Sequence, residues 1–237
     1  MSSRNFIPSS TEVRVGALYQ EPLLEVRESW RYTLQFAGKR ITDFLCAGLG
    51  VLLLSPLLFT IAVLIRIDSR GPIFFRQQRM GRGGKAFVIW KFRTMEVDAE
   101  ARLKDLEAQN ESAGGVLFKM REDPRVTRIG KFLRRTSLDE LPQLFNVLQG
   151  SMSLVGPRPL QLRDYYLAIQ FHRDTMSHRS ALLPGVTGLW QVSGRSEVTF
   201  DDMLRLDLFY KENWSIWLDL YILWRTVVVV LARQGAY

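Results

Sequence analysis

The sequence predicts a mostly α-helical α/β protein that is attached to a membrane near its N-terminus and carries one small β-hairpin. Three observations support this prediction. An uncharged apolar segment occupies residues 44–65, two strand-like segments at 72–79 and 85–92 have glycines between them, and amphipathic helical patterns run through the C-terminal half.

Composition limits the kinds of protein that this chain can be. The 237 residues suffice for one large domain with appendages, and a hydrophobic content of 47% argues against several membrane spans. The net charge of +8 favours anionic partners such as phosphates, nucleic acid or acidic lipid headgroups. A single cysteine excludes an internal disulfide, and two histidines argue against a histidine metal cluster or a Ser-His-Asp triad.

The apolar segment at 44–65 is long enough to cross a bilayer. As a straight helix it would measure about 33 Å, against a hydrocarbon layer of about 30 Å. Basic residues flank both of its ends, and the positive-inside rule would keep both ends in the cytoplasm. Pro56 offers a break because it clashes with the carbonyl of Leu52, and Ser55 can bond a carbonyl that the break frees. A re-entrant helix-break-helix and a spanning helix with a proline kink both remain open.

The segments at 72–79 and 85–92 alternate in the manner of paired strands. Gly81, Gly83 and Gly84 lie between them and suit a tight turn. No Lys-Ser/Thr follows these glycines at Walker A spacing, so a hairpin is the preferred interpretation.

The rest of the chain is predicted to be helical after a weakly ordered lead-in at 1–35. Helices are expected at 96–110, 126–135, 138–148 and 161–180. Near the C-terminus four aromatic residues follow the spacing of one helical face: Trp214, Trp217, Tyr221 and Trp224. This face is either a core stripe or, as we favour beside a membrane segment, a surface at the level of the lipid headgroups.

The stretch R-R-T-S-L-D-E-L-P-Q (134–143) places Asp139 and Glu140 directly after a basic run. A structural alternative is a capping box, with Ser137 as the N-cap and Glu140 three residues later. Pro142 argues against it, because a proline in a helix interior costs about 3 kcal/mol. A helix that starts one or two residues later avoids most of that cost and places Asp139 at its positive end, where the carboxylate stays ionised.

An ionised aspartate can act as a nucleophile toward phosphorus, and a neighbouring glutamate can bind Mg²⁺ together with substrate phosphates. Such a reaction needs cations to offset the repulsion between anions. Arg158 is held between two prolines in G-P-R-P, and Lys91 and Arg93 follow a strand in W-K-F-R-T-M. Taken singly, each is more commonly a buried turn arginine or a solvated lysine than a ligand.

Longer stretches carry a resemblance to a known family. They are K-R-I-T-D-F before the apolar segment, G-P-I-F-F-R-Q-Q-R-M-G (71–81), K-F-R-T-M (91–95), D-P-R-V-T-R-I-G (123–130), the block from L-R-R-T-S-L-D-E-L-P-Q to L-V-G-P-R-P-L (133–160), P-G-V-T-G-L-W-Q-V-S-G-R (184–195) and E-N-W-S-I-W-L-D-L (212–220). Over residues 36–237 the chain closely resembles the bacterial sugar transferases, the monotopic phosphoglycosyl transferases.

This resemblance implies transfer of a sugar 1-phosphate from a UDP-sugar to undecaprenyl phosphate, with release of UMP and with Mg²⁺ as the cofactor. It implies that Asp139 is the nucleophile and that Glu140 is the Mg²⁺ ligand. The other expected substrate contacts are Arg134 and Arg158 for phosphate, with Lys91 and Arg93 as additions to this phosphate set, and Gln143, Gln191 and Arg195 for the rest of the substrate. The stretch W-Q-V-S-G-R is similar to the subgroup that acts on glucose or galactose in exopolysaccharide, O-antigen or capsule assembly.

The resemblance also favours the re-entrant path for the membrane helix, broken at Ser55 and Pro56. The expected division is a lead-in at 1–35, a re-entrant membrane helix at 36–66 and a catalytic domain at 67–237 with membrane-surface C-terminal helices. The protein would then lie on the cytoplasmic face of the bacterial inner membrane, as a homodimer in some relatives. Many relatives carry a lysine where Leu183 stands here, and larger relatives have further spans before this core.

Two other functions compete with this one. A membrane-tethered basic protein could bind nucleic acid or acidic lipid through residues 119–135, but that run has no interleaved base-reading side chains beyond Phe132. An ordinary glycosyltransferase would move the sugar without its phosphate and release UDP. We therefore expect no nucleic-acid partner.

Overall fold

The computed structural model describes residues 30–99, 101–102, 106, 120, 122–194 and 198–232. The elements, in chain order, are α1 (Trp30–Asp68), β1 (Phe74–Met80), the 3₁₀ turn η2 (Arg82–Gly84), β2 (Ala86–Phe92), α3 (Arg128–Thr136), the 3₁₀ turn η4 (Leu138–Glu140), α4 (Gln143–Leu148), β3 (Ser153–Val155), α5 (Leu162–Ser180), β4 (Gly185–Thr187), α6 (Leu189–Val192), α7 (Phe200–Glu212) and α8 (Ile216–Leu231). The predicted class, mostly helical with a small hairpin, is confirmed.

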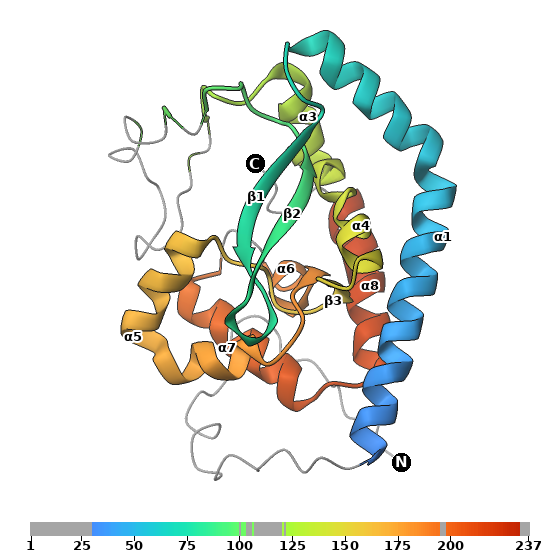
Figure 1. Ribbon diagram of the computed structural model, residues 1–237, viewed down its shortest axis with the longest axis vertical. Helices are drawn as coiled ribbons and strands as arrows, with labels where there is room; N and C mark the ends of the chain where they lie inside the picture. Colours follow the sequence, from blue (N-terminus) through green and yellow to red (C-terminus); the bar gives the residue numbers. More distant parts are fainter. Residues whose placement is uncertain are drawn as a thin grey trace.

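Figure 1 shows α1 along one side of the molecule, the β1–β2 hairpin in the middle, and α5 and α7 on the far side. The helix α4 lies between α1 and the hairpin and contacts both. Predicted helices at 126–135 and 161–180 correspond to α3 and α5. Most of the helix expected at 96–110 falls outside the described residues.

The helix α1 carries the apolar segment. Within the described residues, one stretch, Phe36–Asp68, is long and apolar enough to cross a membrane; its most apolar window has a mean hydropathy of 2.5 and is 11% buried. The helix continues through Pro56, and the Ser55 hydroxyl donates to the Leu52 carbonyl at 2.8 Å, the bond expected for a carbonyl freed by proline. Figure 1 shows the ribbon of α1 changing direction along its length. The re-entrant path of this segment stays a prediction.

The hairpin forms as the sequence predicts. Strands β1 and β2 pair antiparallel, with Arg79 opposite Phe87 and Phe75 opposite Lys91. Gly83 and Gly84 in the turn have φ values of 66° and 71°, the left-handed region that glycine enters without steric cost. Because side chains alternate along a strand, Arg79 and Lys91 project from the same face of the hairpin.

The helix α4 joins the hairpin to the membrane helix. Ala47 of α1, Ile89 of β2 and Val147 of α4 share one buried apolar cluster. The side chain of Asn146 also bonds the edge of β2, since it accepts from the Trp90 amide at 2.9 Å and donates to the Val88 carbonyl at 2.7 Å. The strand that carries Lys91 is therefore fixed against α1 through α4.

A buried polar network joins the first part of α1 to the C-terminal half of the chain. Lys39 donates to the carboxylate of Asp219 in α8 at 2.6 Å, and Asp43 accepts from the backbone amide of Leu154 in β3 at 3.0 Å. Arg40 donates to the Met152 carbonyl at 2.9 Å. These contacts set α1 and α8 side by side, as Figure 1 also shows.

The four C-terminal aromatics do not share one helical face, which corrects the sequence prediction. Ser215 caps α8, so Trp214 lies before the helix, where its indole donates to Asp219 at 3.2 Å. Trp214 and Tyr221 pack against a buried apolar cluster, while Trp217 and Trp224 are 77% and 65% exposed. The exposed apolar face of α8 consists of Ile216, Trp217, Leu220, Trp224, Val227, Val228 and Leu231.

Candidate active site

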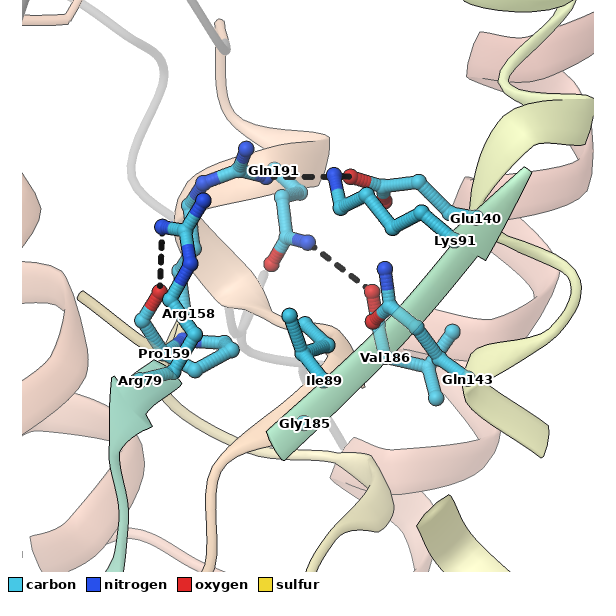
Figure 2. Close-up of a pocket in the computed structure, with 10 residues that line it drawn as sticks. All are labelled: Arg79, Ile89, Lys91, Glu140, Gln143, Arg158, Pro159, Gly185, Val186 and Gln191. Atoms are coloured by element: carbon cyan, nitrogen blue, oxygen red, sulfur yellow. Dashed lines mark hydrogen bonds and ion pairs between the residues drawn. The ribbon is translucent and has the colours of Figure 1, made fainter. Parts of the chain in front are cut away.

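A pocket lies between the hairpin, η4, α6 and the loop that precedes α5. Its lining residues are Arg79, Ile89, Lys91, Glu140, Gln143, Arg158, Pro159, Gly185, Val186 and Gln191. Figure 2 shows Arg79 and Arg158 on one side of it and Lys91, Glu140 and Gln143 on the other. Elements that are far apart in the sequence thus bring five of the expected site residues to one place.

The sharp turn between α3 and α4 presents the two carboxylates. Ser137 has a left-handed backbone (φ 55°), ends α3 and makes no capping bond to η4, so the capping box does not form. The turn begins at Leu138, as a late start predicts, but the α-helix begins only at Gln143. Pro142 is the N-cap of α4, a position where its missing N–H costs no intrahelical bond.

Glu140 lies between two cations. The ammonium of Lys91 donates to Glu140 Oε1 at 2.6 Å, and Arg158 Nη1 lies 3.6 Å from the same oxygen. Lys91 Nζ also lies 4.0 Å from Asp139 Oδ2. Lys91, Glu140 and Arg158 therefore line the pocket together, as expected, while buried Asp139 lies next to them but is not among the lining residues.

Burial, and not a helix end, controls the ionisation of Asp139. Desolvation raises the pKa of this carboxyl from 3.8 to about 6; the Lys91 cation opposes that rise and the Glu140 carboxylate adds to it. The expectation that a helix N-terminus keeps Asp139 ionised is not met, because α4 starts four residues later and the side chain is buried. A pKa near 6 still leaves the carboxylate mostly ionised at pH 7.

Arg134 lies near Asp139 but outside the lining of the pocket. Its Nε donates to the Thr94 hydroxyl at 3.0 Å. Burial lowers the pKa of its guanidinium, and the charge of Asp139 opposes that shift. Arg134 is thus an electrostatic neighbour of Asp139 but does not line the pocket.

The structure does not bring Arg93 into the pocket. Its guanidinium donates to the carbonyl and to the hydroxyl of Ser69 at the end of α1, both at 2.7 Å, and the residue is only 5% exposed. Arg93 follows the end of β2, where the strand has passed the pocket and meets the loop after α1. It therefore fastens that loop to the hairpin.

Two glutamines give the pocket uncharged polar groups. Gln143 and Gln191 are both buried and both line it. Gln191 donates through Nε2 to the Val186 carbonyl at 3.0 Å, as Figure 2 shows, while its buried Oε1 has no hydrogen-bond partner among the described residues. Arg195 lies outside the described residues.

Arg79 also lines the pocket, although its sequence context did not predict this role. Its guanidinium donates to the Pro159 carbonyl at 3.2 Å and to the Gln77 side chain at 2.6 Å. Burial, followed by the nearby charge of Arg158, lowers the pKa of Arg79 to about 10, so it remains a cation at pH 7. Side chains alternate along β1 and so place Arg79 on the same hairpin face as Lys91, and this was the sequence signal that could have identified Arg79.

Asp139 and Glu140 suit a metal site that water and substrate phosphates complete better than one that protein side chains alone enclose. Across the described residues, no group of three or more His, Cys, Asp or Glu side chains could enclose a metal ion. Adjacent Asp139 and Glu140 suit Mg²⁺, which binds through one or two carboxylates and takes its remaining ligands from water and substrate phosphates.

The described residues combine a helix that is apolar and long enough to cross a membrane with a charged pocket, in which half-buried Glu140 lies beside Lys91 and Arg158 and next to buried Asp139. These features are those of a membrane-associated protein with a charged site. The chain belongs to the bacterial sugar transferase family, whose model matches residues 34–233.

Curated relatives agree with this assignment. The chain is 46% identical over 200 residues to "Galactosyl transferase CpsE" of Streptococcus agalactiae, covering 84% of this chain and 43% of the relative. It is 43% identical over 202 residues to "Undecaprenyl-phosphate galactose phosphotransferase" of Salmonella typhimurium, covering 84% and 41%. It is 38% identical over 206 residues to "Exopolysaccharide production protein ExoY" of Sinorhizobium fredii, covering 84% and 88%. The chain thus spans less than half of the first two relatives and most of the third.

Proposed function

We propose that the protein transfers a hexose 1-phosphate from a UDP-sugar to undecaprenyl phosphate, releases UMP and so begins the assembly of an exopolysaccharide, O-antigen or capsule. The observation that carries the proposal is the cluster of Glu140, Lys91 and Arg158 at the pocket, with the buried Asp139 carboxylate 4.0 Å from the Lys91 ammonium. Relatives named for undecaprenyl-phosphate hexose transfer support the choice of donor and acceptor.

In the first step, a carboxylate oxygen of Asp139 attacks the phosphorus that bears the sugar. A bond forms between this oxygen and phosphorus, the bond from phosphorus to the bridging oxygen breaks, and UMP leaves with the electron pair. Because UMP is a stable anion, no general acid is needed, which fits a pocket without histidine among its lining residues. The product is an aspartyl phosphosugar.

In the second step, a phosphate oxygen of the lipid attacks the same phosphorus. The new bridging P–O bond forms, the bond between Asp139 and phosphorus breaks, and the carboxylate is restored. Lys91 and Arg158 reduce the repulsion between the attacking anion and the phosphoryl group in both steps. Neither step changes the net number of protons on the protein.

Other residues of the site hold the donor. Gln143 and Gln191 offer amide groups to uncharged parts of the substrate, and the unpaired Oε1 of Gln191 suits a hydroxyl or N–H donor. Arg134 adds positive potential behind Asp139. Mg²⁺, held by Glu140 with Asp139 beside it, would neutralise diphosphate charge when bound.

We infer that the pocket lies at the membrane surface, where a polyprenyl phosphate presents its headgroup; the apolar helix α1 and the exposed apolar face of α8 support this inference. We assign α1 to a re-entrant path with both ends in the cytoplasm, and the exposed apolar face of α8 to the headgroup level. The protein would lie on the cytoplasmic face of the inner membrane.

Nucleotide release tests the proposal. Purified protein in detergent receives Mg²⁺, undecaprenyl phosphate and, in turn, UDP-glucose, UDP-galactose and N-acetylated UDP-sugars. We expect lipid-dependent UMP with one of these donors, and a loss of more than about 1,000-fold in Asp139→Asn, since a nucleophile is removed. Asp98→Asn, which alters an exposed carboxylate, is the matched control.

Other outcomes would contradict the proposal in different ways. Release of UDP would indicate ordinary glycosyl transfer. Full activity in Asp139→Asn would remove Asp139 from the mechanism. No release with any of the donors would favour a membrane-tethered anion-binding protein.

A further inference from the structure

The loop at residues 156–159 carries Arg158, and its backbone is held from several sides. The amide of Gly156 donates to the Thr187 carbonyl, and the Pro157 carbonyl accepts from the Gly185 amide, both at 2.9 Å. These two bonds join the start of the loop to both ends of β4. They leave the carbonyls of Arg158 and Pro159 to other donors.

Arginine side chains bond both of those carbonyls. Arg79 Nη1 donates to the Pro159 carbonyl at 3.2 Å, and Arg179 Nη2 makes a short hydrogen bond to the Arg158 carbonyl. Bonds from a charged donor are stronger than those between neutral groups. The carbonyls of Arg158 itself and of the adjacent Pro159 are therefore each held by a guanidinium from a different element.

Arg179 is itself fixed by a buried carboxylate. Its Nε donates to Asp207 in α7 at 2.7 Å, and the two side chains are only 6% and 2% exposed. A planar guanidinium can hold a carboxylate and a carbonyl at once in a set geometry, which a lysine cannot do. Breaking such a buried pair is costly, and replacing it with apolar residues is often neutral or stabilising, so stability alone does not explain it.

Neither Arg179 nor Asp207 lines the pocket, and the proposed reaction uses neither. We propose that the Arg179–Asp207 pair is a positioning pair that fixes the backbone of Arg158, together with Arg79, and so aims the Arg158 guanidinium at the donor phosphates. The inference rests on the proposed function, because it assumes that Arg158 meets a phosphate.

The chain contains a matched control for this pair. Arg125 is equally buried, donates through Nε and Nη2 to Asp123 and donates through Nη1 to a backbone carbonyl, that of Ala99. It therefore has the same kind of contacts as Arg179 but does not hold the Arg158 loop. Arg179→Met and Arg125→Met remove comparable buried ion pairs, and Arg179→Lys keeps the charge at 179 without the fork.

The kinetic test is a double-mutant cycle with Arg158→Gln on the UMP-release assay. We expect Arg179→Met and Arg179→Lys to lower kcat/KM by about 10- to 100-fold, and Arg125→Met by less than about threefold. In the Arg158→Gln background, Arg179→Lys should change kcat/KM by less than about twofold, because its effect passes through Arg158. An equal loss in both backgrounds would overturn the positioning role.

Crystal structures of Arg179→Lys and of Arg125→Met give a readout that does not depend on activity. We expect the Arg158 guanidinium to be displaced or spread over several conformers in Arg179→Lys, and unchanged in Arg125→Met. An unmoved Arg158 in Arg179→Lys would overturn the proposal even if no donor were turned over. Failure of the wild-type protein to release UMP, with Arg158 displaced as expected, would instead count against the proposed function alone.

Discussion

The pocket and the apolar belt, which consists of the exposed apolar side chains of α1 and α8, have opposite chemistry. In the pocket, Glu140 Oε1 lies 2.6 Å from the Lys91 ammonium and 3.6 Å from Arg158 Nη1. The belt has no charged residue at 44–65, and Phe59 within it is 72% exposed. The helix α4 packs between α1 and β2 and connects the two regions, and its first residue, Gln143, also lines the pocket. A substitution in one region should leave the function of the other intact.

Among the variants that test this separation, the largest effect is expected from Arg158→Gln. Removing a cation that faces the reacting phosphate should lower kcat/KM by about 100- to 1,000-fold. Membrane retention should not change, because Arg158 is remote from the belt. UMP release and membrane flotation measure the two properties.

Arg76→Gln is the control for that variant, since Arg76 projects from the opposite face of the hairpin and lies over the Trp90 ring at 4.0 Å. An equal loss of activity in Arg76→Gln, or loss of Arg158→Gln from the membrane fraction, would break the separation between the two regions.

A smaller effect is expected on stability at Asp139. Because its folded-state pKa of about 6 exceeds the unfolded value of 3.8, the folded protein binds a proton at Asp139 more tightly than the unfolded chain does. The contribution of this proton to the free energy of unfolding is therefore greatest at low pH and is lost as the pH rises through about 6. Asp139→Asn should therefore raise the free energy of unfolding at pH 8 by about 1–3 kcal/mol, and this gain should shrink toward pH 5. Denaturant unfolding of the two proteins across pH 5–8 measures the difference.

The same pKa predicts an acid limb in the activity of the wild-type protein. Since the nucleophile must be ionised, kcat/KM should fall as the pH drops below about 6.

In the unfolding experiment, a gain in stability of Asp139→Asn that is constant with pH would show that burial does not control the ionisation of Asp139.

The smallest effect is expected at the belt residues of α8. If Trp217 and Trp224 contact lipid, each contributes roughly 1 kcal/mol to membrane binding, a small share beside the contribution of α1. In vesicles with brominated lipids, we expect tryptophan quenching to fall in Trp217→Phe/Trp224→Phe. Trp190→Phe should leave it unchanged, because Trp190 is buried. Persistent quenching in the double variant would remove α8 from the belt.

Local chemistry explains which parts of the fold the sequence could predict. Glycines with positive φ and alternating residues specify the hairpin without help from other elements. Ser215 as an N-cap decides that Trp214 stays outside α8, a signal that the regular spacing of the aromatics concealed. Aromatic spacing predicts a face only where every member is helical.

The candidate site depends more on tertiary contacts. Lys91 and Arg93 are two residues apart, yet one reaches Glu140 and the other reaches Ser69, because β2 ends between them and the loop after α1 packs there. Arg79 enters the pocket because β1 docks on the segment at 159–161, through an isolated bridge between Arg79 and Gln161. No local pattern in either segment encodes that docking.

The contact between Lys39 and Asp219 has a consequence for how the protein is made. The two residues are 180 positions apart, so the ribosome must synthesise most of the chain before the closest carboxylate of Lys39 exists. Until then Lys39 has Asp43, at 4.0 Å, as its acidic neighbour within α1. The contact that joins α1 to α8 therefore forms only after α1, the hairpin and most of the catalytic-site elements have been synthesised.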